Sequence, residues 1–188
     1  MNTLFIDTHG DFIFLAIYKN DKILIEKEIY EKKDHSTVCF PTLVGLLSDA
    51  NLDIHDIHDL IVVIGPGSFT GVRIGVTIAK TLAYTLNIPI RTITSLELYL
   101  DPENLKEKYL ALEEKNGYYI GKLNQNQIVE YMYLKKEEFS NFAQKNKIQM
   151  CTKINKSLLS SFAHQKQAVN PHLVNPFYVK KIGVEKND

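Results

Sequence analysis

The sequence lacks several features that would point directly to a function. Lysine and arginine total 22, as do aspartate and glutamate, so the formal net charge is zero. Composition therefore provides no global field that would favour nucleic acid or an anionic membrane surface. No apolar run approaches the roughly 20 residues that a membrane-spanning helix needs. No basic segment precedes the apolar residues of the N-terminus, so we expect a strand there rather than a signal peptide, and a cytoplasmic protein.

Cysteine is also scarce. The 188 residues include only Cys39 and Cys151, which lie far apart and form no Cys-x-x-Cys pair. A disulfide framework or a cysteine-based zinc site would need more thiols at closer spacing. We expect two reduced thiols that behave as small apolar residues.

The first half of the chain has the pattern of a mixed α/β sheet. Three strands joined by hairpins are expected first, with a tight turn at Asn20-Asp21. The run FIFLAIY is too continuously apolar to have a solvent-exposed face, so its strand should be central, whereas KILIEKEIY suits an outer strand. A strand–helix–strand unit with a parallel crossover follows. The expected strands are 3–7, 12–18, 22–30, 60–64 and 90–94, and the expected helices are 34–50 and 69–87.

Two details of the first helix are open. Ser36 or Thr37 is the expected N-terminal cap. Pro41 would then lie too deep in the helix, which predicts a kink or a delayed start.

The second half has weaker patterns. Strands are expected at 109–113, 118–123 and 128–134, a polar helix at 135–145 and another helix at 157–164. A short strand, Phe177–Val179, should follow Pro176. We expect a domain boundary near residue 100, with an N-terminal domain at 1–100 and a shortened C-terminal domain at 101–188.

The stretch GPGSFTGVRIG, residues 65–75, follows the buried strand at 60–64 and begins the long helix. It lacks the glycine-lysine pair of a phosphate-binding loop, and its glycine spacing does not fit the dinucleotide fingerprint. Ser68 can cap the helix, and the free N–H groups of the first turn would attract an anion. Two interpretations stay open, a nucleotide-binding turn and a sharp strand-to-helix turn that glycine permits. The candidate phosphate or nucleotide residues are Asp7, Thr8, Gly65, Gly67 and Ser68.

The helix behind this turn is apolar on more than one side. One band of small and aliphatic residues, which includes Val72 and Ala79, can cover the sheet. Gly71, Ile74, Ile78 and Leu82 form a second apolar band, wider than a helix packed on one side needs. The second band requires another neighbour, either the 38–50 helix of this chain or a different protein.

No catalytic motif is complete. Ser68 does not lie in a Gly-x-Ser-x-Gly elbow, because Pro66 stands where the first glycine belongs. His55 and His58 lie in a polar connector, and His35, His164 and His172 are isolated, so we expect solvated turn residues rather than metal ligands. Asp7 could hold a hydrated magnesium ion if a nucleotide binds, but a turn-stabilising role is the alternative. The pairs Lys32-Lys33 and Lys180-Lys181 are expected to be ordinary solvated surface.

A long contiguous stretch, GPGSFTGVRIGVTIAKTLAYTLNIPI, resembles the signature of the TsaB (YeaZ) family. MNTLFIDTHGD with FIFLAIY resembles that family's first two strands, and DHSTVCFPTLVGLL resembles its first helix. TITSLELYL and the tail segment NPFYVKK also match. The resemblance is close over residues 1–100 and thin beyond. His9 departs from the small residue that is commoner after the aspartate-threonine pair, and LEEKNGYY stands where the family has aspartate-alanine-arginine and then glycine.

The resemblance implies an actin-like ATPase fold (ASKHA, ribonuclease H-like) with a reduced second domain. It also implies a non-catalytic subunit of the machinery that forms threonylcarbamoyladenosine at tRNA position 37. Such a subunit pairs with a TsaD-like catalytic protein through its two N-terminal helices, with a TsaE-like ATPase completing the assembly and tRNA involved indirectly. ATP or ADP with Mg²⁺ is expected, if at all, at the heteromer interface rather than as a cofactor of this chain.

On this basis we expect the partner surface to lie on the two helices, and a homodimer through the same surface when the partner is absent. The interpretation has two rivals, an actin-like nucleotide-binding phosphotransferase or ATPase and a glycoprotease-type metallopeptidase. The expected interface residues are Val38, Leu43, Leu47, Phe69, Thr70, Gly71, Arg73, Ile74, Ile78 and Leu82.

Overall fold

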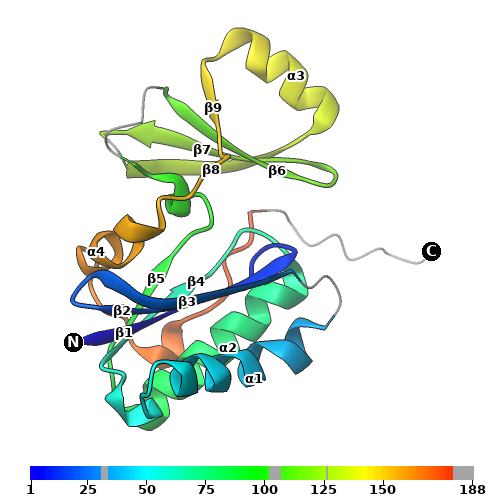
Figure 1. Ribbon diagram of the computed structural model, residues 1–188. Coiled ribbons are helices and arrows are strands. Elements are labelled where there is room, and N and C mark those ends of the chain that lie inside the picture. Colours follow the sequence, from blue (N-terminus) through cyan, green and yellow to red (C-terminus); the bar gives the residue numbers. More distant parts are fainter. Residues whose placement is uncertain (31–33, 102–106, 126, 180–188) are drawn as a thin grey trace.

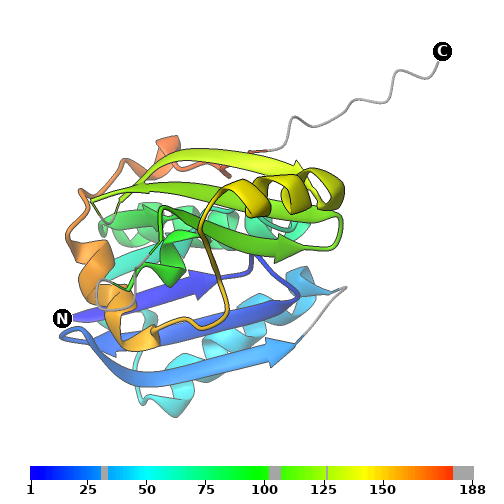
Figure 2. The ribbon, with the colours of Figure 1, turned by 90° about the horizontal axis from the view of Figure 1, so that it is seen from above.

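The structure is a computed structural model that describes residues 1–30, 34–101, 107–125 and 127–179. It has two sheets, one above the other, with helices on the outer face of each and a helical connection at one side (Figures 1 and 2). Lys32-Lys33 and Lys180-Lys181 lie outside the described residues. Within the described residues, no helix is both long enough and apolar enough to cross a membrane.

The first sheet has five strands in the order β3-β2-β1-β4-β5. β1, β2 and β3 are antiparallel neighbours, whereas β4 is parallel to β1 and β5 is parallel to β4. The tight turn at Asn20-Asp21 is confirmed, with φ values of 50° and 62°. β2 is central and buried and β3 is at the edge, as predicted. The strands are β1 (Asn2–Asp7), β2 (Phe12–Lys19), β3 (Lys22–Tyr30), β4 (Asp59–Val63) and β5 (Ile90–Ile93).

Two helices cover one face of this sheet, α1 (His35–Asp49) and α2 (Phe69–Leu86). A short 3-10 helix, η1 (Ile54–Asp56), precedes β4. Ser68 caps α2 as predicted, because its Oγ accepts a hydrogen bond from Gly71 N at 3.1 Å. The predicted cap of α1 is wrong: Asp34 occupies the N-cap without a side-chain hydrogen bond, and Pro41 lies inside a helix that has already started. The start is therefore not delayed.

The sheet separates two hydrophobic cores because alternate strand residues point to opposite faces. Leu4, Ile6 and Leu15 belong to the core beneath α1 and α2. Phe5, Phe14 and their neighbours face the other way, toward the second sheet and the C-terminal helix. Both faces are thus covered, and every residue of β4 is buried.

The second sheet follows a 3-10 turn, η2 (Glu97–Tyr99), and has the strand order β8-β7-β6-β9. α3 (Lys136–Lys145) lies on its outer side (Figure 1). The three predicted hairpin strands are present. A fourth strand, which was not predicted, pairs parallel to β6 through three residues. The strands are β6 (Tyr109–Glu114), β7 (Gly117–Asn124), β8 (Gln127–Lys135) and β9 (Ile148–Met150).

After β9 the chain returns to the first sheet. η3 (Lys156–Leu158) and α4 (Leu159–His164) pack on its second face, and Leu159 and Ala163 join the core there. Val169 then pairs with Ile90, and η4 (Pro171–Leu173) lies against α2. The predicted strand at Phe177–Val179 is wrong: Phe177 N donates to Ile64 O at 2.7 Å, but no ladder develops. The predicted division near residue 100 stays a prediction, since residues 156–177 contact the first sheet again.

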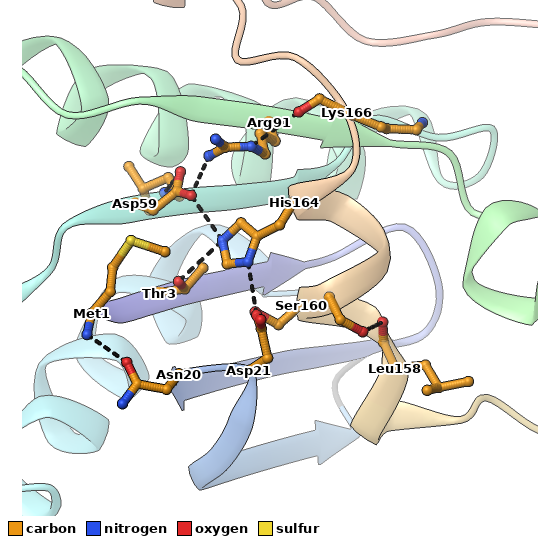
Figure 3. Close-up of polar contacts among 12 residues, drawn as sticks. Met1, Thr3, Asn20, Asp21, Asp59, Arg91, Leu158, Ser160, His164 and Lys166 are labelled. Atoms are coloured by element: carbon orange, nitrogen blue, oxygen red, sulfur yellow. Dashed lines mark hydrogen bonds and ion pairs between the residues drawn. The ribbon is translucent and has the colours of Figure 1, made fainter.

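A polar cluster holds α4 against the ends of three strands (Figure 3). His164 Nε2 lies 2.9 Å from Asp59 Oδ2 in β4, and His164 Nδ1 lies 2.7 Å from Asp21 Oδ1 in the β2–β3 turn. Arg91 in β5 forms an ion pair with the same Asp59 oxygen. We call these four residues the His164 clamp. The prediction that His164 is a solvated turn residue is therefore wrong.

Candidate functional site

A groove runs between α1 and α2 on the outer face of the helical layer. It has a volume of about 440 Å³, and more than half of its wall comes from the first three turns of α2. Phe40 and Phe69 are 51% and 44% exposed at this surface. We call it the α1–α2 groove; its lining residues are Ser36, Phe40, Phe69, Thr70, Arg73, Ile74, Thr77 and Ile78.

The expected interface residues divide into three groups. Five of them line the groove, namely Phe69, Thr70, Arg73, Ile74 and Ile78. Val38 and Leu82 are half-buried and pack against the core outside it. Leu43, Leu47 and Gly71 are buried, with Leu43 1% and Leu47 7% exposed, so these three face the chain's own core rather than a partner.

Sequence reasoning missed two exposed apolar residues of α1. Phe40 and Val44 are each 51% exposed and stand four residues apart, so they lie on one side of the helix. The signal was available in this spacing, because Cys39, Leu43 and Leu46 form the buried side and leave Phe40 and Val44 on the other. Counting every apolar residue of α1 as one face hid this division.

Aromatic and cationic groups meet at the end of the groove nearest the start of α2. The Arg73 guanidinium carbon lies 4.3 Å from the centre of the Phe69 ring. The Tyr178 ring stacks with Phe69 at 5.4 Å between centroids, so the C-terminal segment contributes to this end of the surface. Among the described residues, Arg73 is the one charged residue of the groove lining, and its guanidinium can pair with a carboxylate or carbonyl of a bound molecule.

The glycine turn packs tightly against the β1–β2 turn. A Cβ atom on Gly71 would lie 2.2 Å from Thr8 O, and one on Gly67 would lie 2.3 Å from His9 O. Ser68 N donates to His9 O at 2.7 Å, and Thr8 Oγ1 donates to Gly71 O at 2.7 Å. Glycine at 67 and 71 is thus required by close backbone approach.

The five candidate nucleotide residues therefore lie in one region, at the carboxyl ends of β1 and β4. Thr8 and Gly65 are buried. Gly67 and Ser68 line a cleft of about 910 Å³ between the two sheets, whereas Asp7 is 1% exposed and does not line it. One Asp7 oxygen, Oδ1, accepts hydrogen bonds from His9 N at 3.0 Å and His9 Nδ1 at 2.7 Å.

Neither thiol is placed for nucleophilic chemistry. Burial raises the pKa of Cys39 to about 11 and that of Cys151 to about 12, so both are protonated at neutral pH. His58 Nδ1 accepts a hydrogen bond from Asn2 N, and His172 contacts the Tyr84 ring. Among the described residues, no group of three or more His, Cys, Asp or Glu is arranged to hold a metal ion.

Comparison with known proteins identifies the relatives of this chain. A family model described as "TsaD: tRNA N6-adenosine threonylcarbamoyltransferase" matches residues 23–114. The tRNA threonylcarbamoyladenosine biosynthesis protein TsaB of Bacillus subtilis is 44% identical over 97 residues, which cover 52% of this chain and 42% of that protein. The match therefore spans less than half the length of this curated relative.

Two solved structures share the fold over nearly the whole chain. An uncharacterized protein with similarity to peptidase YEAZ from Pseudomonas aeruginosa superposes with a TM-score of 0.74 at 16% identity, covering 95% of this chain and 99% of that one. YeaZ from Pseudomonas aeruginosa gives a TM-score of 0.70 at 16% identity over 94% and 99% of the two chains. The predicted mixed α/β fold is confirmed, and it is the fold of these two structures. This chain is similar in sequence to the TsaB proteins over about half of its length and similar in fold to YeaZ over 94% of it.

Proposed function

We propose that this chain is a non-catalytic partner subunit in the formation of N6-threonylcarbamoyladenosine on tRNA, and that it binds a TsaD-like catalytic protein through the α1–α2 groove. The observation that carries the proposal is this groove, an apolar surface with exposed aromatic rings within residues 23–114, which match the TsaD family model. The relative supports the pathway through its name, and the groove supports the role of a binding subunit.

The groove has the composition of an interface centre. Two aromatic rings and an arginine, Phe40, Phe69 and Arg73, stand around the half-buried aliphatic side chains of Ile74 and Ile78. Aromatic residues and arginine are enriched at the positions that contribute most to binding between proteins, whereas lysine and glutamate are depleted there. Within the part of the chain that the structure describes, no lysine, aspartate or glutamate lines the groove.

The groove also defines the chemistry of the partner. Apolar side chains that project from a helix or loop would contact Ile74, Ile78 and the Phe40 ring. A carboxylate or carbonyl oxygen at the edge would accept hydrogen bonds from Arg73, whose guanidinium already lies over Phe69. The partner surface should therefore be mainly apolar with one acidic or acceptor group.

The remaining partners follow from the same role. A TsaE-like ATPase would join the pair, and tRNA would contact the assembly mainly through the catalytic subunit, in the cytoplasm. When the partner is absent, the exposed rings should bring two copies of the chain together, because an isologous contact buries the same surface twice. Sedimentation velocity across a concentration series measures this homodimer.

The test is a charge placed on the groove wall. Thr77 is exposed and lines the groove, so Thr77→Arg adds a cation next to Arg73 without disturbing the core. We expect affinity for the TsaD-like protein of the same organism to fall at least about tenfold, since an unpaired charge must be desolvated on binding. Isothermal titration calorimetry with the purified full chain provides the measurement.

Ser140→Arg is the matched control. Ser140 is an exposed hydroxyl residue on α3, and its substitution adds the same charge to a helix of the second sheet. Affinity should stay within about threefold of wild type, because surface changes away from an interface are usually small. Equal binding by the wild type and Thr77→Arg would show that the groove is not the docking surface.

A further inference from the structure

The candidate nucleotide residues lie at the end of β1 and in the turn after β4, and their contacts do not fit a metal-bound nucleotide. A magnesium–nucleotide site needs an accessible carboxylate for the hydrated ion and free backbone N–H groups for the phosphates. Asp7 is the carboxylate that the sequence offers, and residues 65–68 form the turn.

Asp7 is already bound within the chain. Its Oδ1 accepts two hydrogen bonds from His9, one from the backbone N–H at 3.0 Å and one from the ring Nδ1 at 2.7 Å. A carboxylate only accepts, so the imidazole must donate from Nδ1. The ring itself is 6% exposed and lines the cleft, and it also packs edge-on against Phe12. The histidine side chain is therefore placed between the carboxylate and the cleft.

The second oxygen of Asp7, Oδ2, is not exposed to the cleft. Oδ2 is buried and has no hydrogen-bond partner. Buried carboxylate oxygens without a donor are rare, and such an atom would normally indicate an ion or a water molecule. Asp7 is not part of the cleft wall, however, and hydrated magnesium keeps several water molecules that need space.

Backbone N–H groups of the glycine turn also form hydrogen bonds within the chain. Ser68 N donates to His9 O, and Gly71 N donates to the Ser68 hydroxyl. The approach of Gly67 to His9 O is close enough that a Cβ atom could not fit. The Ser68 N–H therefore joins the two turns and the Gly71 N–H caps α2, so neither group is free to bind a phosphate.

The charges that line the cleft oppose a phosphate as well. Asp11, Glu113 and Glu114 contribute three carboxylates to its wall, and Lys115 contributes one ammonium group. The phosphates of a nucleotide would bring further negative charge next to these carboxylates.

We propose that the His9 ring occupies the position beside Asp7 that a metal ion would need, and that the Asp7–His9 contact therefore prevents this chain from binding metal-bound nucleotides. Position 9 then determines whether the carboxylate can be used. A small residue there would remove the ring donor from Asp7 and let its carboxylate turn toward the cleft. The proposal concerns the isolated chain and is independent of the α1–α2 groove.

The experiment compares metal and nucleotide binding by the wild-type chain, the single variants Asp7→Asn and His9→Ser, and the double variant Asp7→Asn/His9→Ser. Electron paramagnetic resonance of Mn²⁺ counts bound metal, and titration calorimetry with ATP and Mg²⁺ measures nucleotide binding. We expect wild type and Asp7→Asn to behave alike. His9→Ser should bind Mn²⁺ at least about tenfold more tightly, and the double variant should lose this gain.

His55→Ser is the matched control, because it removes an exposed histidine from the connector before β4 and should leave Mn²⁺ binding unchanged. Circular dichroism checks that each variant is folded. Metal-dependent binding in the wild type that Asp7→Asn abolishes would overturn the proposal, and so would a folded His9→Ser chain that gains nothing. If His9→Ser does not fold, the comparison of wild type with Asp7→Asn still decides whether Asp7 is closed.

Discussion

The His164 clamp makes a prediction about how α4 is attached to the first sheet. We expect His164→Ala to lower the stability of the chain more than any single exposed ion pair does. His164 is 17% exposed and its two ring nitrogens contact two carboxylates, whereas Asp59 is 1% exposed. Burial raises the pKa of the Asp59 carboxyl, and Arg91 and His164 oppose that rise, so the histidine stabilises the charged form.

The magnitude follows from the two bonds that are lost. A hydrogen bond to a charged group contributes about 1.5–3 kcal/mol, and the bond to buried Asp59 belongs to this class. Asp21 is 45% exposed, so its bond contributes about 0.2–1 kcal/mol. Because Arg91 stays paired with Asp59 in the variant, the lower part of the combined range applies. We expect a loss of about 2 kcal/mol, which lowers the Tm of a chain of this size by about 4–8 °C.

Thermal unfolding followed by circular dichroism measures the effect, with Asp21→Asn as the comparison. Asn keeps an acceptor for the Ser160 hydroxyl and tolerates the left-handed turn, so Asp21→Asn removes only the charge on the exposed side of the clamp and should lower Tm by less than half as much. If both variants lowered Tm equally, or if His164→Ala changed it by less than about 2 °C, the buried bond to Asp59 would not hold α4 in place.

Three further predictions concern α1, α2 and the buried thiol. Gly71→Ala should destabilise the chain by about 3 kcal/mol or more, because the new Cβ would lie 2.2 Å from Thr8 O. At Gly45 a new Cβ would meet only the end of a flexible lysine side chain, so Gly45→Ala should stabilise α1 by up to about 1 kcal/mol. Urea titration measures the free energy of unfolding of both variants. Burial raises the pKa of Cys39 to about 11, so the unfolded chain loses the thiol proton first as pH rises above about 8.5. The free energy of unfolding should therefore fall as pH rises from about 8.5 to about 11. Labelling of Cys39 with a thiol reagent at pH 8 should require unfolding. Thr85→Arg, on the exposed side of the last turns of α2 and outside the groove lining, should leave calorimetric affinity for the TsaD-like protein within about threefold.

Most of the first sheet was predictable because its signals are local. The apolar run of β2, the turn at Asn20-Asp21 and the serine cap of α2 each depend on residues close together in sequence. The predicted elements therefore match the structure to within one or two residues. Pro41 misled the prediction of α1, because the helix tolerates it within its first two turns.

The failures share a non-local cause. β9 exists because three residues find an edge of β6, about 40 positions earlier in the chain, and nothing within those three residues indicates it. His164 has no charged neighbour that marks it in sequence, since Asp21 and Asp59 are brought to it by the β2–β3 turn and by β4. Asp7 and His9 are only two residues apart in sequence, but their side chains bond to each other because both are buried at the end of β1.

The two-sided helix α2 was the basis of the functional prediction, and the structure divides its second apolar band. Along that band, Leu82 is half-buried against the core and lies outside the groove, while Ile74 and Ile78 pack on the core and also form part of the groove wall. The chain's own α1 therefore covers only part of the band, and the apolar surface that remains is concentrated at the first three turns of α2. Phe40 of α1 and Tyr178 of the C-terminal segment lie at this same surface, one in the lining and one on the Phe69 ring. Three segments far apart in sequence thus present apolar groups at one place, and a protein partner would bury them together.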